Sequence, residues 1–286
     1  MSPDDPIIVA KCLTKRYGDL VAVDDLSVTV NKGEIFGFLG PNGAGKTTTI
    51  KMLTTMAQPT AGKVTIAGFD SQKDYRDARS NIGVIQQHHS LDKDISVREN
   101  IIHHALMQNM PRSKIKERVQ ELSDIMNLED HMDVLVEKLS GGWKKRVAIV
   151  CSIVHDPPVL FMDEPTTGLD TQSRNALWAL IRKLNRNGCT IFLTTHYISE
   201  AEALCDRVGI INKGKMIALG TNDELRALIG TVAVEQLDDN GESQNRYFNS
   251  RVDAKEYMQG LPEDVNVSLR RTDLEDVFLE LTGRKL

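Results

Sequence analysis

The apolar residues of this 286-residue chain fall into short continuous runs and into longer stretches with helical spacing. Two runs, 34–39 and 159–162, are almost entirely apolar, which is typical of parallel strands buried on both faces of a sheet. In the stretches 96–128 and 171–187, apolar residues recur every three or four positions, as on one face of a helix. Strands that alternate with helices in this way predict an α/β domain built on a parallel sheet.

Other segments have the pattern of antiparallel strands. Between residues 7 and 30, β-branched stretches are separated by turn residues, and 63–68 has the same character. A hairpin is predicted where 208–211 and 216–219 flank a turn. We therefore expect an antiparallel β subdomain beside the parallel sheet, and a helical subdomain inserted at about 92–157.

The tail has a smaller pattern of its own. Two short strands, a helix over 252–259, an alternating strand and a final helix follow one another after residue 231. Thr272 and Glu275 have the spacing of a capping box at the start of that last helix. The sequence therefore predicts a large domain over 1–230 and a small ββαβα accessory domain over 231–286.

Composition excludes several classes of protein. The chain is 41% hydrophobic and 26% charged, which is ordinary for a globular protein. Its net charge is -5, whereas nucleic-acid-binding domains are usually strongly basic, so no nucleic acid is expected as a partner. The four cysteines lack C-x-x-C spacing, which favours reduced thiols. No apolar run approaches the roughly 18–20 residues that cross a bilayer, and the N-terminus lacks a signal-peptide pattern, so no direct membrane insertion is expected.

A phosphate-binding loop is the strongest local motif. Residues 40–47 fit the pattern G-x-x-x-x-G-K-[ST] between a predicted strand and a predicted helix. Its glycines let backbone N–H groups face phosphate oxygens, and the helix N-terminus adds partial positive charge. Lys46 is expected to bind the β- and γ-phosphates, and the Thr47 hydroxyl to ligate Mg²⁺. The residues expected to bind nucleotide here are Gly40, Asn42, Gly43, Gly45, Lys46, Thr47 and Thr48.

Two carboxylates follow the buried run 159–162. Asp163 is expected to orient Mg²⁺ and its water, and Glu164 to polarise the attacking water. His196 follows the next predicted strand, so it is expected at the same edge of the sheet. Ser140-Gly141-Gly142 precedes a helix and forms a second anion-binding design.

For Tyr17, beside a turn, the sequence leaves two alternatives: a platform that stacks on adenine, or a half-buried strand aromatic.

In this order, these motifs resemble the nucleotide-binding subunit of ATP-binding cassette (ABC) transporters over roughly 7–225. The phosphate loop matches the family's Walker A segment, 139–142 its signature, and 159–164 its Walker B strand with the catalytic glutamate. Gly168-Leu169-Asp170 is similar to the D-loop. The resemblance implies a P-loop NTPase core of the RecA type. The tail resembles the accessory domain of the daunorubicin-type export subclass, which also includes polysaccharide and lipid exporters.

The resemblance also implies roles for single residues. It assigns catalysis to Glu164, the switch histidine His196, Lys46 and the Q-loop glutamine Gln87. Mg²⁺ would be held by Thr47, Gln87 and Asp163, and Tyr17 would stack on adenine. The nucleotide would also be contacted by Ser140, Gly141, Gly142, Trp143 and Asp170. Trp143 departs from the family pattern, which has glutamine there; it could stack on the nucleotide of the opposing subunit or pack against the helical insertion.

For the whole chain, the resemblance implies an ATPase with ATP and Mg²⁺ as cofactors. Two copies would close head to tail around ATP and drive a separate transmembrane permease, with the chain peripheral at the cytoplasmic face of the membrane. The alternative is a soluble ABC ATPase that acts as a mechanical switch outside transport. Such proteins usually carry tandem cassettes or coiled-coil insertions, and this chain has neither. The sequence does not identify a cargo.

Overall fold

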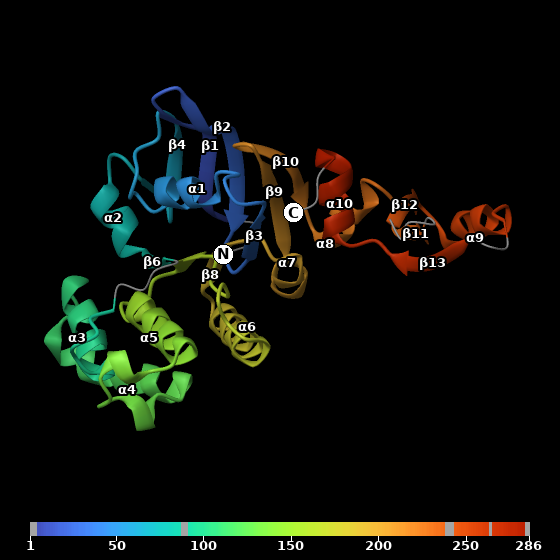
Figure 1. The fold of residues 1–286 in the computed structure, drawn as a ribbon. Coiled ribbons are helices and arrows are strands. Elements are labelled where there is room, and N and C mark those ends of the chain that lie inside the picture. The colour runs from blue at the N-terminus through green and yellow to red at the C-terminus, as the bar shows by residue number, and fades with distance from the viewer. Residues whose placement is uncertain (1–4, 87–90, 238–242, 263–264, 284–286) are drawn as a thin grey trace.

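Two sheets and a helical lobe form the main body, and a third, small sheet lies to one side of it (Figure 1). The computed structural model describes residues 5–86, 91–237, 243–262 and 265–283. Among these residues, no helix is long and apolar enough to cross a membrane. The four cysteines are free thiols, as expected.

The central sheet contains the buried apolar runs. Its strand order is β10-β9-β3-β8-β7-β6, parallel except for the edge strand β10. Its strands are β3 (Ile35–Leu39), β6 (Ile82–Ile85), β7 (Val159–Asp163), β8 (Thr190–Thr195), β9 (Arg207–Asn212) and β10 (Lys215–Gly220). All side chains of β3, β7 and β8 are buried, because helices or strands cover both faces. The carboxyl ends of these three strands therefore meet at one edge.

An antiparallel sheet covers one face of this layer, with helix α1 (Lys46–Leu53) between the two. Its order is β2-β1-β4-β5, and its strands are β1 (Pro6–Tyr17), β2 (Leu20–Asn31), β4 (Ala61–Ile66) and β5 (Phe69–Asp70). Ile50 and Leu53 of α1 join one apolar cluster with residues of both sheets. The short helix α2 (Tyr75–Ser80) leads into β6. The predicted antiparallel subdomain is present.

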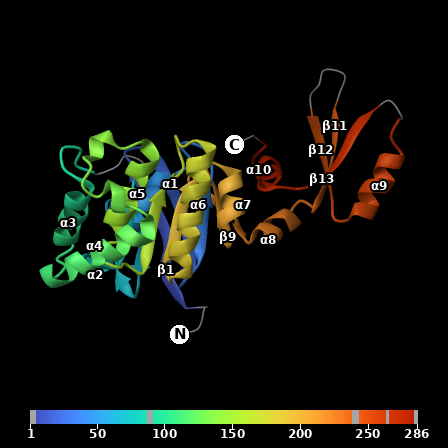
Figure 2. The same cartoon turned by 90° about the horizontal axis from the view of Figure 1, so that it is seen from below.

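On the opposite face lie α5 (Gly141–Ile153), α6 (Thr171–Arg186) and α7 (Ile198–Leu204), side by side in Figure 2. The helical insertion places α5 against α3 (Val97–Met107) and α4 (Arg112–Met126), with the short turns η1 (Glu129–His131) and η2 (Val136–Lys138) between α4 and α5. Ser96 and Glu99 form a capping box at the start of α3. The continuous helical pattern over 96–128 is broken into two helices, because Asn109 adopts a left-handed conformation and Pro111 follows it.

The tail has the predicted order of elements. These are β11 (Val232–Leu237), β12 (Ser243–Phe248), α9 (Arg251–Gln259), β13 (Asn266–Arg271) and α10 (Leu274–Thr282). The predicted capping box is wrong by one residue: Asp273 caps α10 and pairs with Asp276. Thr272 is buried instead, and its hydroxyl donates to the carbonyl of Gly230. The side chain of Thr272 therefore bonds to the turn at Gly230, before β11, and does not cap α10.

The last helix packs its apolar side chains on the main body, while its Asp276 bonds to the small sheet. Leu274, Val277 and Phe278 join the same apolar cluster as α6 and α7. Helix α8 (Asn222–Ala227) lies between this body and the small sheet (Figure 1). The division into 1–230 and 231–286 stays a prediction, and the observed packing attaches the end of the tail to the large domain.

Candidate functional site

The loop between β3 and α1 has a backbone that only glycine permits at two positions. A Cβ atom at Gly40 would overlap the carbonyl oxygen of Ile211. At Gly45, φ is 109°, and a Cβ atom would lie 2.7 Å from the carbonyl oxygen of Ala22. No side chain caps the N-terminus of α1, so its first N–H groups face the loop. The loop therefore presents backbone donors to an anion.

Lys46 begins α1, and its ammonium group lies beneath the loop. Its Nζ donates to the carbonyl oxygens of Gly40 at 2.7 Å and Pro41 at 3.1 Å. The same atom lies 3.2 Å from Oε1 of Glu164. Because the side chains of Lys46 and Glu164 are 4% and 11% exposed, this ion pair is largely removed from water.

Glu164 follows β7 and has a strained backbone. Its φ of 48° is left-handed, which is costly for a residue with a Cβ atom and common at functional sites. Its N–H group donates to Thr194 of the neighbouring strand β8, whose hydroxyl also donates to Asp163 at 2.6 Å. Nδ1 of His196 lies 3.2 Å from Oε2 of Glu164. The sheet edge thus brings Asp163, Glu164 and His196 together, as the sequence predicts.

Charge around Glu164 determines its protonation. Burial acts to raise the pKa of this carboxyl, but the positive charge and hydrogen bond of Lys46, together with those of His196, outweigh burial and lower the pKa below its ordinary value. The group is therefore a carboxylate at neutral pH, the form that can accept a proton from water.

A cavity of about 730 Å³ connects the loop to the antiparallel sheet. Its lining residues come from β1–β2, the phosphate loop, the end of β7 and the β9–β10 turn: Tyr17, Leu20, Val21, Ala22, Asn42, Gly43, Gly45, Lys46, Thr47, Thr48, Glu164, Lys213 and Gly214. Tyr17 ends β1 and is 49% exposed, so it is a half-buried strand aromatic whose ring also lines the cavity; its stacking on adenine stays a prediction. The cavity is large enough for a nucleotide.

Five lining residues escaped the sequence analysis: Leu20, Val21 and Ala22 of β2, and the pair Lys213 and Gly214. Lys213 and Gly214 form the turn of the β9–β10 hairpin, and the sequence identified them only as a turn. The N–H of Gly214 donates to the carbonyl of Ala44, and its own carbonyl accepts from Asp24. These bonds hold the turn against the phosphate loop. No local signal predicts this contact, since the two segments are far apart in the chain.

The same edge has groups that suit Mg²⁺. Thr47 is exposed on the first turn of α1, and Asp163 supplies one buried carboxylate. Mg²⁺ in proteins usually takes one or two protein oxygens and completes its shell with phosphate and water, so this small set fits. Within the described ranges, no cluster of three or more His, Cys, Asp or Glu residues offers an all-protein metal site. Gln87, predicted as a further ligand and catalytic group, lies outside the described residues.

The second anion-binding motif lies outside this cavity. Ser140 caps α5 by accepting from the N–H of Trp143. Ser140, Gly142 and Trp143 line a separate hollow of about 170 Å³ between α5 and α6. Asp170 caps α6 by accepting from the N–H and hydroxyl of Ser173, both at 2.8 Å. Ser140, Gly141, Gly142, Trp143 and Asp170 are thus absent from the lining of the phosphate-loop cavity.

Trp143 packs against the helical insertion, the second of its two alternatives. Its ring stacks on His131 with centroids 3.9 Å apart, and the guanidinium of Arg146 lies 4.7 Å from its centre. The ring is only partly buried, and it also lines the hollow beside Ser140. Contact with a nucleotide stays a prediction.

Comparison with known proteins agrees with these features. A family model described as ABC transporter matches residues 23–167. The chain is 38% identical to "Nod factor export ATP-binding protein I" of Ralstonia nicotianae, over 98% of this chain and 95% of the relative. It is 40% identical to the protein of the same name from a Rhizobium species, over 95% of both chains.

Solved structures share the fold. The "ATP binding subunit of ABC transporter" superposes with a TM-score of 0.74 at 25% identity, over 96% of this chain and 99% of that one. A part of the cbiONQ ABC transporter complex of Clostridium perfringens has a TM-score of 0.72 at 29% identity, over 78% and 92%. An ATP-binding cassette in a dimeric post-hydrolysis state, bound to ADP and Pi, has a TM-score of 0.67 at 25% identity, over 75% and 98%.

Proposed function

This chain belongs to the ABC transporter family as an ATP-binding subunit that hydrolyses ATP, and we propose that two copies close head to tail to drive export through a separate membrane subunit. One observation carries the proposal: the chain holds two halves of a nucleotide site that do not meet. Lys46 and Glu164 lie in one cavity, whereas Ser140 and Gly142 line another. A second copy, rotated to bring its Ser140 to this Lys46, completes both sites at once.

Within each site the residues divide the work. Lys46 exchanges its bond to Glu164 for the β- and γ-phosphates, and Tyr17 stacks on the adenine. Thr47 and Asp163 would hold Mg²⁺, which would neutralise developing phosphate charge. Glu164, freed from Lys46 and oriented by His196, accepts a proton from the attacking water. Ser140 and Gly142 of the other copy donate to the terminal phosphate through the N-terminus of α5.

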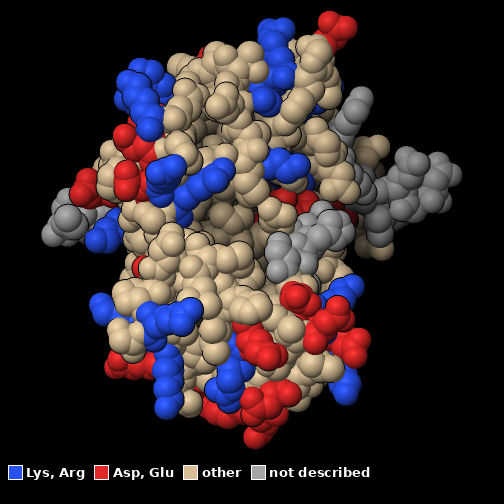
Figure 3. Space-filling model, turned by 90° about the vertical axis from the view of Figure 1, so that its left-hand side faces the viewer, with Lys and Arg blue, Asp and Glu red and all other residues tan. Residues whose placement is uncertain are grey.

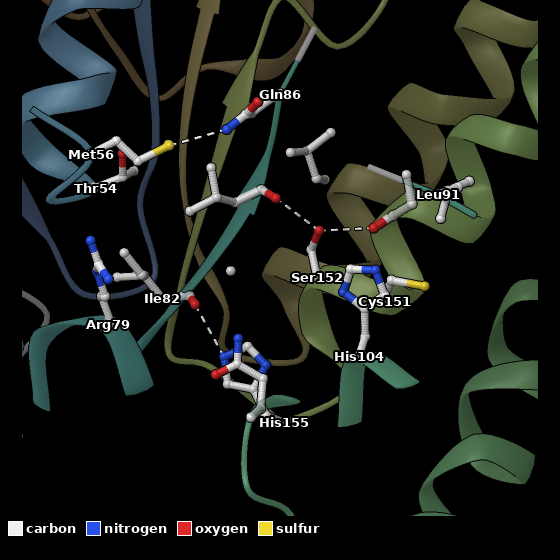
Figure 4. A pocket seen from close by; sticks show the side chains of 15 residues that line it. Thr54, Met56, Arg79, Ile82, Gln86, Leu91, His104, Cys151, Ser152 and His155 are labelled. Carbon is white, nitrogen blue, oxygen red and sulfur yellow. Dashed lines mark hydrogen bonds between the residues drawn. The ribbon is translucent and has the colours of Figure 1, made fainter. Parts of the chain in front are cut away.

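A groove between the main body and the helical insertion is the proposed docking place for the membrane subunit. It has a volume of about 260 Å³, and Figure 4 shows its two walls. Arg79 and Ile82 lie on the side of the main body, and His104, Ser152 and His155 on the side of the insertion. Nε2 of His155 lies 3.1 Å from the carbonyl of Ile82. On this face of the molecule, mostly uncharged residues separate charged regions above and below (Figure 3).

The direction and location of transport are also part of the proposal. The similar chains are named for Nod factor export, and the tail resembles that of an export subclass. As a transporter subunit the chain associates with the membrane peripherally, and we place it at the cytoplasmic face. Selection of the cargo belongs to the membrane subunit. The alternative, a switch outside transport, would leave the groove without a membrane partner.

Affinity purification of the full chain from membranes tests this function. We expect a membrane protein to co-purify and to raise the ATPase rate. Arg79→Asp reverses a groove charge whose guanidinium is fixed by Thr55, with Nε 2.6 Å from its hydroxyl, so it should reduce recovery of the partner about tenfold. Arg76→Asp is the matched control, because Arg76 belongs to the same helix and does not line the groove. Purification without any membrane protein would contradict the transport role.

A further inference from the structure

Glu200 is a fully buried carboxyl group that the roles proposed above do not use. It lies on α7, four residues after His196, and is 0% exposed. Its Oε1 accepts a hydrogen bond from Nε1 of Trp178 at 3.1 Å. Trp178 belongs to α6, the helix that Asp170 caps. One bond therefore joins the helix after the D-loop to the helix after the switch histidine, and the two helices lie side by side (Figure 2).

The same carboxyl faces two threonines in the segments that hold Glu164 and His196. Thr166 lies two residues after Glu164, and Thr195 directly precedes His196; both are 1% exposed. Their hydroxyl groups lie close enough to Glu200 to affect its pKa. In this arrangement, among the described residues, neither Oε2 of Glu200 nor Oγ1 of Thr166 has a hydrogen bond of good geometry. Within the described part of the chain, two buried polar atoms thus have no partner in this arrangement, which is rare in folded proteins.

Charged groups also surround Glu200. Burial raises its pKa, and the hydrogen bond of Trp178, the nearby hydroxyl groups of Thr195 and Thr166 and the charge of Arg174 act in the opposite direction. Lys145 approaches from α5, the helix that Ser140 caps, and is itself 4% exposed. An apolar side chain of similar size could fill this space without the cost of burying a polar group. The carboxyl group is therefore explained better by the bonds it makes than by packing.

We propose that Glu200 is a positioning residue for ATP hydrolysis. Its carboxyl group holds the loop after Glu164, the strand end before His196 and the D-loop helix in one arrangement. It thereby keeps His196 and Glu164 at the separation observed here. The inference depends on the catalytic roles proposed for those two residues, but not on the membrane partner or on the direction of transport.

Steady-state ATPase assays on the full chain test this role. Glu200→Leu keeps the volume and removes every hydrogen bond; we expect kcat to fall about tenfold and KM for ATP to change by less than about twofold, because only the arrangement of reacting groups changes. Glu200→Gln keeps a hydrogen-bonding group of the same shape and should retain at least about half of the wild-type kcat. Trp178→Phe removes the indole donor together with part of the ring volume, and a loss of about threefold is expected.

Leu204→Ala is the control for destabilisation alone. Leu204 lies on the same helix and is buried, so this variant should lower the melting temperature and leave kcat per folded molecule unchanged. If Glu200→Leu does not fold, the inference is tested by comparing kcat of Trp178→Phe with kcat of Glu200→Gln. Wild-type kcat in Glu200→Leu or in Trp178→Phe, or equal losses in Glu200→Leu and Glu200→Gln, would overturn the inference. Failure of an inactive Glu164→Gln to dimerise would instead contradict the proposed sandwich of two copies. It would not change the interpretation of the Glu200 variants.

Discussion

Nζ of Lys46 lies 3.2 Å from Oε1 of Glu164, so the lysine of the phosphate loop and the carboxylate expected to activate water neutralise one another. Both side chains are largely buried, which makes the pair costly to break without a replacement. A phosphate that binds Lys46 supplies this replacement. In the proposed function, nucleotide binding would therefore release the carboxylate of Glu164 through this one ammonium group.

Glu164→Gln tests this coupling. The amide cannot accept the proton of the attacking water, so kcat should fall at least about 100-fold. Lys46 loses its ionic partner, and ATP should therefore bind more tightly than to the wild type. The variant should accumulate as an ATP-bound dimer in size-exclusion chromatography. Elution as a monomer at saturating ATP would contradict the sandwich of two copies.

Tyr17→Ala tests the stacking surface. Loss of the ring should raise KM for ATP about tenfold and leave kcat nearly unchanged, because stacking supports binding and not the chemical step. Tyr17→Phe keeps the ring and is the matched control. Equal KM values for all three proteins would show that the ring does not contact the base.

Trp143→Gln restores the residue usual in the family and separates the two roles of the ring. Loss of stacking on His131 should lower the free energy of unfolding by about 1 kcal/mol, measured by urea denaturation. Hydrolysis should be retained, with a changed KM for ATP if the ring also contacts the nucleotide of the opposing copy. An unchanged KM would leave packing as its only role.

Asp276→Asn tests the attachment of the tail. Both oxygens of Asp276 accept from Arg270 of β13, at 2.6 and 2.7 Å, and the carboxyl is 3% exposed. Asp276 lies on α10, so the pair links the small sheet to the main body. Its loss should cost about 1.5 kcal/mol at neutral pH, because a charge-assisted pair of hydrogen bonds is weakened while Arg270, 32% exposed, keeps Glu235 and Asp273 nearby.

The pH dependence of this effect follows from the pKa of Asp276. Burial raises it, but the hydrogen bonds and charge of Arg270 outweigh burial and lower it below 3.8. The stabilisation is therefore fully present above that value and is lost as the pH falls through the lower pKa of the folded state. Denaturation of wild type and Asp276→Asn should differ at about pH 7 and converge once the pH falls below the folded-state pKa of Asp276. Arg271→Gln, which removes an exposed pair with Asp223, should change stability by less than about 1 kcal/mol at either pH.

Local patterns carried most of the prediction. The family and the fold class are confirmed by the comparisons. Both could be predicted because the phosphate loop, the buried strands and the helix caps are short-range features of the sequence. The errors arose where the local pattern suits two neighbouring residues, or two backbone conformations, about equally well. Thr272 and Asp273 both suit the start of α10, and burial of Thr272 against Gly230 decided between them. The break at Asn109 likewise lies inside a continuous helical pattern.

The sequence by itself determined where the candidate site residues lie in the fold, since their motifs place Lys46 at the start of a helix and Asp163 and Glu164 at the end of a strand. Only the tertiary structure decided what these residues touch. It joined Lys46 to Glu164, set the β9–β10 turn against the phosphate loop, and directed Ser140 into a different hollow from Lys46. The physical reason is that such contacts join segments far apart in the chain, and their geometry is set by how sheets and helices pack and not by any local pattern.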